Sequence, residues 1–162
     1  MHIGTLSLVV WLSAAAAIAQ RPIQSAKAGI INLTATEQAS VHFQIQGKDK
    51  DIVIPYCEKD SEGSFVICGV GEVTLQYFDG KKWIRTKPGY PGEVFGVEDS
   101  QWNPAPVLAG SSVGFRFDFR PNLYHIQRGK RLRLLVYYWR DPEAMKSAGA
   151  DGTFISPSFV CP

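Results

Sequence analysis

Few side chains in this sequence have the types and spacing that catalysis requires. Its 162 residues include three histidines, of which His42 and His125 lie beyond the apolar N-terminal stretch. Neither belongs to a serine nucleophile elbow, to a His-Glu-x-x-His helix or to a set of carboxylates at metal-ligand spacing. The GVGE stretch at 69–72 leads into a strand pattern, whereas a phosphate site needs a helix N-terminus. We therefore expect no catalytic residue, no metal site and no cofactor, and predict that the protein is not an enzyme.

The three cysteines indicate a disulfide rather than a metal site, since no Cys-x-x-Cys spacing is present. In an oxidising compartment one pair is expected to close and one cysteine to remain. Cys57 and Cys68 bracket the short polar stretch EKDSEGSFVI, and we favour this pair. Cys161 is the third cysteine, so the Cys68–Cys161 and Cys57–Cys161 pairs stay open, as do three free thiols.

The N-terminus has the pattern of a secretory signal peptide. Residues 3–19 carry no charge, are mostly apolar and end in Ala17-Ile18-Ala19, which resembles an A-x-A cleavage site. We expect a signal peptide over residues 1–19 cleaved near Ala19, a flexible segment over 20–28, and a secreted or periplasmic protein. The first residues lack Lys and Arg, so an uncleaved membrane anchor is the alternative. After cleavage we expect no stable membrane insertion, and a net charge of +2 gives no field that attracts nucleic acid.

Short strands separated by turns dominate the rest of the chain. Apolar and polar residues alternate most clearly over 40–47, 112–120 and 130–139, as in strands with one buried face. Further strands are expected at 30–35, 51–57, 65–78, 81–85 and 153–160, the last with Pro157 inside it. No helical period persists over ten residues. The pattern predicts an all-β fold, an antiparallel sandwich or barrel of about seven to eight strands, in one domain over 29–162.

Three of these stretches resemble bacterial immunoglobulin-like domains of secreted and envelope proteins. LQYFDGKKWI (75–84) is similar to the family's Tyr-Asp-Gly-Gly-Lys-Trp-Val stretch, LAGS (108–111) stands for its PPGES-like turn, and RGKRL (128–132) for its PGKYRI stretch. The likeness covers about residues 30–160. The stretch between Cys57 and Cys68 has no counterpart in the family, and the LAGS turn (108–111) lacks the proline of the family's turn. The resemblance implies a seven-stranded immunoglobulin-like sandwich and no particular activity, because such modules act as spacers, adhesion units and binding domains.

Two regions offer candidate binding residues. The connection 86–111 is the longest irregular stretch and carries aromatic residues, which supply flat contact area at low entropic cost. We also expect Arg116 to lie near Arg131 and Arg133 on one solvent face, where arginines could bind an anionic glycan or simply keep the sheet face wet. On the strand 130–139 we expect the Arg133 side to carry Trp139 outward as well. The candidate binding residues are Trp83, Tyr90, Trp102, Arg116 and Arg133.

The orientation of Trp83 depends on the loop around Asp79-Gly80. A two-residue turn places Trp83 on the outer face, whereas a three-residue loop turns it toward the core. Because the resemblance treats this tryptophan as part of the scaffold, we expect it to be half-buried.

We expect a non-catalytic secreted or periplasmic module with a binding or structural role, recognising an unknown protein or glycan partner through the loop 86–111. The alternatives are a secreted inhibitor with a disulfide-constrained loop and an envelope assembly module.

Overall fold

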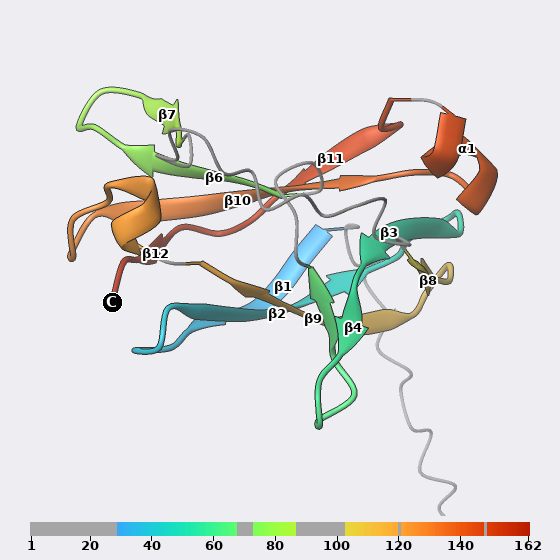
Figure 1. Ribbon diagram of the computed structural model, residues 1–162. Helices are drawn as coiled ribbons and strands as arrows, with labels where there is room; N and C mark the ends of the chain where they lie inside the picture. Colours follow the sequence, from blue (N-terminus) through green and yellow to red (C-terminus); the bar gives the residue numbers. More distant parts are fainter. Residues whose placement is uncertain (1–28, 68–72, 87–102, 120, 148) are drawn as a thin grey trace, which may run out of the picture.

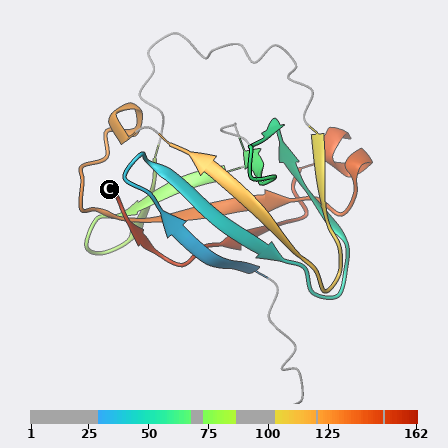
Figure 2. The ribbon, with the colours of Figure 1, turned by 90° about the horizontal axis from the view of Figure 1, so that it is seen from below.

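The structure is a computed structural model that describes residues 29–67, 73–86, 103–119, 121–147 and 149–162. The predicted signal peptide and the segment 20–28 lie outside these residues. Strands make up more than half of the described residues, against one short α-helix and one short 3-10 helix, so the all-β prediction is confirmed. Figure 1 shows two layers of strands, and Figure 2 shows the lower layer from outside.

The lower sheet contains five strands in the order β1-β2-β9-β5-β4. Val41, Phe43 and Ile45 of β2 are buried, as are Phe115 and Phe117 of β9. This is the alternation expected for strands with one face on the core. The bounds are β1 (Gly29–Ala35), β2 (Ser40–Gln46), β4 (Glu58–Lys59), β5 (Phe65–Ile67) and β9 (Ser112–Asp118). All neighbours are antiparallel except β5 and β9, which run parallel.

The upper sheet has the order β11-β10-β6-β7, and β12 also pairs with the start of β10. Its central strand β10 buries Leu132, Leu134 and Val136 against the lower sheet. The bounds are β6 (Val73–Phe78), β7 (Trp83–Arg85), β10 (Arg131–Tyr138), β11 (Gly152–Ile155) and β12 (Phe159–Val160). The strand predicted at 153–160 is thus divided in two around Ser156, whose hydroxyl accepts the Leu134 N–H at 2.8 Å.

A separate two-stranded sheet pairs β3 (Ile52–Tyr56) with β8 (Asn103–Val107). Part of the connection predicted as irregular over 86–111 is therefore a strand. β3 also forms a bridge from Val53 to Trp139, just after β10, and α1 (Pro142–Ser147) follows. Trp139 packs with Val53 and Ala144 and is buried, so the expectation that it faces solvent is wrong. The chain leaves the upper sheet at this point, because Trp139 pairs with β3 instead.

The described residues form twelve strands, more than the seven to eight predicted. The extra strands are short. They come from the hairpin β4–β5 within the cysteine-bracketed stretch, from β8, and from the division of the last strand. A short 3-10 helix η1 (Pro121–Tyr124) joins β9 to β10.

The β6–β7 hairpin has a longer loop than either predicted register. Tyr77 pairs with Ile84 and Phe78 with Trp83, which leaves the four residues 79–82 as the loop. The predicted two-residue and three-residue loops are both wrong. Because four residues differ from two by an even number, each side chain keeps the face predicted for the two-residue turn. Trp83 therefore lies on the outer face, where it is half-buried as expected.

The side chain of Asp79 stabilises this loop. Its Oδ1 accepts the backbone N–H groups of Lys81 and Lys82, each at 2.8 Å. Gly80 has φ +102°, a conformation that glycine adopts without strain. The two N–H groups, that of Lys82 first, hold the pKa of Asp79 below its usual 3.8, because they favour the charged carboxylate.

Candidate binding surface

The outer face of the upper sheet brings together two of the predicted binding residues, Trp83 and Arg133, with neighbours that the sequence did not single out. Since side chains alternate along a strand, β10 buries Leu132 and Leu134 and presents Arg131 and Arg133 outward. The strand register places Arg133 beside Gln76, and Gln76 beside Arg85 of β7. We call this the Trp83–Arg133 surface; it consists of Gln76, Phe78, Trp83, Arg85, Arg131 and Arg133.

Arginines stack on both aromatic rings of this surface. The guanidinium carbon of Arg133 lies 4.4 Å from the ring centroid of Trp83, and that of Arg131 lies 5.5 Å from the ring of Phe78. The two rings contact each other with centroids 5.4 Å apart and an interplanar angle of 52°. Stacking of this kind is favourable because the guanidinium is planar, cationic and weakly hydrated.

Hydrogen bonds fix the positions of the two stacked arginines. Arg133 Nε donates to Gln76 Oε1 at 2.7 Å, and Arg131 Nη2 donates to Ser158 Oγ at 3.2 Å. The arginine side chains are therefore oriented before any ligand arrives, which lowers the entropy lost on binding. The sequence pattern indicated that Arg131 and Arg133 face outward, but the stacking on Phe78 and Trp83 depends on strand pairing.

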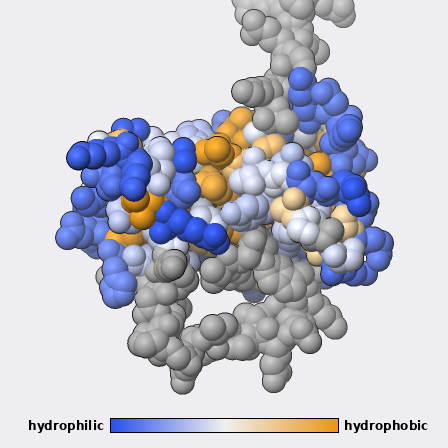
Figure 3. All heavy atoms as spheres, turned by 90° about the horizontal axis from the view of Figure 1, so that it is seen from above, coloured by the Kyte–Doolittle hydropathy of each residue, from blue (hydrophilic) through white to orange (hydrophobic). Residues whose placement is uncertain are grey.

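The surface is basic and adjoins exposed aliphatic residues. The five strands of the upper sheet contain three arginines and no Asp or Glu. Next to them lie Leu135, which is half-buried, and Ile155 and Val160, which are 56% and 57% exposed. Figure 3 shows apolar residues in the middle of this face with hydrophilic residues on both sides.

Arg116 does not belong to this surface, so the predicted common face with Arg131 and Arg133 is wrong. It lies on β9, in the lower sheet, whereas the other two lie on β10 in the upper sheet. The two strands alternate alike, but they present their polar sides on opposite outer faces of the layered structure. Sequence periodicity shows which side of a strand is polar and leaves open which sheet it joins.

Carboxylates surround Arg116. Its Nη1 donates to Asp60 Oδ2 at 3.1 Å, and its Nε lies 3.2 Å from Asp118 Oδ1. The Asp60 side chain is only 6% exposed and also accepts the backbone N–H groups of Glu62 and Ser64. This ion pair joins the β4–β5 hairpin to β9, which is a structural role.

Ser40 and His42 lie beside this cluster, and their geometry does not activate a nucleophile. The Ser40 hydroxyl donates to Asp118 Oδ1 at 2.6 Å, while the His42 Nε2 lies 3.5 Å from the same hydroxyl oxygen. An activated serine would donate its proton to the histidine base. Within the described ranges, no group of three His, Cys, Asp or Glu side chains is placed to hold a metal ion.

Cys161 is a free, buried thiol. This finding contradicts both pairings that involve it. Burial, as the larger effect, raises the pKa of the thiol above its usual 9.0, against a smaller opposite effect of the Arg128 charge. Desolvation disfavours the thiolate, so Cys161 is not a reactive nucleophile.

Several predicted residues lie outside the described part of the chain. They are Cys68, Tyr90 and Trp102. In the part of the chain that is described, no helix is long and apolar enough to cross a membrane. Comparison with protein families, with curated proteins and with solved structures finds no match to this chain.

Proposed function

We propose that this chain is a non-catalytic, secreted or periplasmic module that binds a protein or glycan partner. The observation that carries the proposal is the Trp83–Arg133 surface, where Arg133 stacks on Trp83 and is held by Gln76. Trp and Arg are the residue types that contribute most at binding interfaces. The connection 86–111 starts directly after β7, at Thr86, whose hydroxyl donates to Leu75 O at 2.8 Å. This connection therefore begins beside the surface, which supports its proposed part in binding.

We propose an immunoglobulin-like sandwich as the scaffold. Support comes from the two layers of mainly antiparallel strands and from the buried cluster that both layers share. The parallel β5–β9 pair and the additional strands are departures from a seven-stranded arrangement. Residues 75–84, which resemble the family's Trp-containing stretch, form the β6–β7 hairpin at the edge of the upper sheet.

We propose that Cys57 and Cys68 form a disulfide. Cys161 is free and buried, which leaves Cys68 as the one other cysteine that could pair with Cys57. Such a bond would close the base of the β4–β5 hairpin, and a disulfide fits an oxidising compartment. Peptide mapping with and without reduction tests the pairing. N-terminal sequencing of the exported protein tests cleavage near Ala19.

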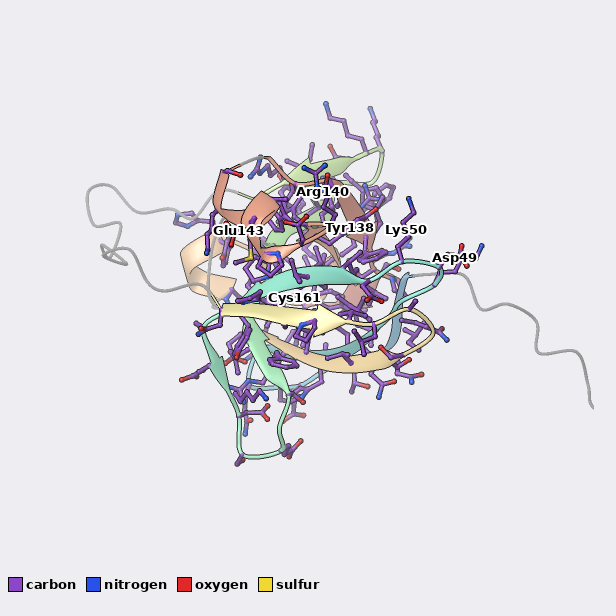
Figure 4. The ribbon with its side chains drawn as sticks, turned by 90° about the vertical axis from the view of Figure 1, so that its right-hand side faces the viewer. Asp49, Lys50, Tyr138, Arg140, Glu143 and Cys161 are labelled. Atoms are coloured by element: carbon purple, nitrogen blue, oxygen red, sulfur yellow. The ribbon has the colours of Figure 1, made fainter. Side chains whose placement is uncertain are left out.

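A partner-capture experiment tests the binding role. The chain is immobilised and exposed to native extract and to a glycan array, in parallel with Trp83→Ala and Arg133→Ala variants. Arg140→Ala is the control, since Arg140 is 70% exposed and lies at the α1 end of the molecule, as Figure 4 shows. We expect a partner that the wild type and the control retain and that both surface variants lose. Equal capture by all four proteins, each checked for its thermal unfolding midpoint, contradicts the proposed surface.

A further inference from the structure

We infer that the partner of the Trp83–Arg133 surface is a protein segment that combines carboxylates with apolar side chains. This inference rests on the proposed binding function and specifies the chemistry of its ligand. It depends on three observations, namely unneutralised arginines, their remaining donors, and the aliphatic residues beside them.

The arginines of this surface lack carboxylate partners within the described residues. Arg85, Arg131 and Arg133 form none of the salt bridges found there. Arg116 on the opposite sheet differs, because Asp60 and Asp118 both neutralise it. The net charge of the chain is only +2, yet this one face carries positive charge that no carboxylate of the described residues neutralises. A negatively charged partner would associate faster with such a face and would be held in one alignment on it.

Stacking leaves the arginine donors usable. A guanidinium that lies over a ring uses its flat face, and its N–H groups point outward in the plane. Arg133 uses Nε for Gln76, and Arg131 uses Nη2 for Ser158, so each keeps further N–H groups for a carboxylate. Carboxylates bind such groups through paired, charge-assisted hydrogen bonds.

The spacing of the arginines fits an extended acidic segment. Arg133 and Arg85 occupy one row across β10, β6 and β7, which is about 10 Å for two strand spacings. Arg131 lies two residues before Arg133, about 7 Å along the strand. Acidic residues at alternate positions of an extended peptide are also about 7 Å apart, so successive carboxylates can reach different arginines.

The aliphatic residues favour a protein over an acidic polysaccharide. Ile155 and Val160 are more than half exposed, and Leu135 lies between Arg133 and Tyr137 on the same strand face. Such side chains gain from burial against apolar residues of a partner, whereas a polysaccharide of charged sugars offers little to bury them. Protein interfaces place apolar side chains centrally and polar residues at the rim, and Figure 3 shows apolar residues in the middle of this face with hydrophilic residues on two sides.

Synthetic probes test the inference directly. Fluorescence anisotropy measures the binding of a peptide that alternates Glu and Leu, of an equally long peptide that alternates Glu and Ser, and of an oligogalacturonate with as many carboxylates. We expect the Glu–Leu peptide to bind most tightly, with affinity that falls as NaCl rises from about 0.05 to about 0.5 M. Oligogalacturonate binding equal to or tighter than that of the Glu–Leu peptide overturns the inference in favour of an acidic glycan.

Charge-reversal variants locate the site. Arg85→Glu is the variant least able to disturb the fold, since none of the hydrogen bonds, ion pairs or ring contacts of the described residues involves the Arg85 side chain. The double variant combines Arg85→Glu with Arg131→Glu. We expect the double variant to bind the Glu–Leu peptide at least about tenfold more weakly, as for loss of an interface hot spot. The charge control is Lys50→Glu, because Lys50 lies on the β2–β3 turn at the other end of the molecule (Figures 1 and 4), and we expect a change below about twofold.

The remaining outcomes separate this inference from the proposed function. An unchanged affinity of the double variant, or concentration-dependent self-association that occupies the surface, overturns the acidic-partner inference. If Trp83→Ala abolishes capture of the native partner while the double reversal leaves that capture intact, the binding function stands and the charge argument fails. If neither affects capture, the surface itself is wrong.

Discussion

Replacing Gly47 with alanine tests the part of the fold that sequence analysis missed, namely the strand β8 inside the connection 86–111. Gly47 follows β2 and is buried against the turn after β8. A Cβ placed on it would lie 2.5 Å from the backbone oxygen of Leu108 and 3.2 Å from its carbonyl carbon. The N–H of Gly47 also donates to Ser111 O at 3.0 Å, which holds the two segments together.

The expected cost of this substitution follows from the contact. Ordinary contacts of a Cβ begin at 3.4 Å, so backbone on one side of the contact must move by nearly one ångström. Overpacking of this kind costs about 1–3 kcal/mol of unfolding free energy. With about 3–5 °C per kcal/mol for a domain of this size, we expect Gly47→Ala to lower the unfolding midpoint by about 3–15 °C.

Differential scanning calorimetry of Gly47→Ala and Gly149→Ala at matched pH and concentration measures the effect. Gly149 is the matched control, because nothing lies within 4 Å of a Cβ placed there, and we expect a change within about 0.5 kcal/mol. Equal midpoints for the two variants would refute the close approach of β2 and the β8–β9 turn, and with it the position of β8.

Three further results are expected. A double-mutant cycle of Trp83→Ala and Arg133→Ala in urea unfolding should give a coupling of about 0.5–1 kcal/mol; zero coupling contradicts the stacking. The pKa of Asp79 is below 3.8 in the folded state, so its contribution to stability is present above pH 3.8 and is lost as pH falls through the lower folded pKa. Asp79→Asn should therefore flatten the acid limb of a plot of unfolding midpoint against pH, and an unaltered limb counts against the loop cap. The Cys161 thiol should react with a disulfide reagent only in denaturant, since it is buried and its pKa is raised; fast labelling of the native protein contradicts its burial.

Local alternation identified much of the scaffold from sequence. The pattern of 40–47 and 112–120 predicted which residues of β2 and β9 are buried, and the pattern of 130–139 did so for β10 up to Tyr138. A strand alternates with period two whatever it pairs with, so inward and outward positions depend mainly on the residues themselves. The same reasoning indicated that Arg131 and Arg133 face outward and form part of a candidate site.

The partners of each strand were decided by tertiary structure. Alternation cannot assign β9 and β10 to different sheets, which is why Arg116 was grouped with Arg133. The loop cap by Asp79 set a four-residue turn and brought Phe78 beside Trp83, and pairing with β10 then placed Arg133 on that ring. Pairing of β3 with Trp139 turned that residue inward against its alternation. In most of these cases the deciding contacts join residues that are far apart in the chain. For the Asp79 loop, several turn types have similar energies, and the packing of the sheets selects one of them. The sequence by itself therefore determined an all-β chain with its buried and exposed strand faces, and the packing of the sheets determined which exposed residues meet to form a surface.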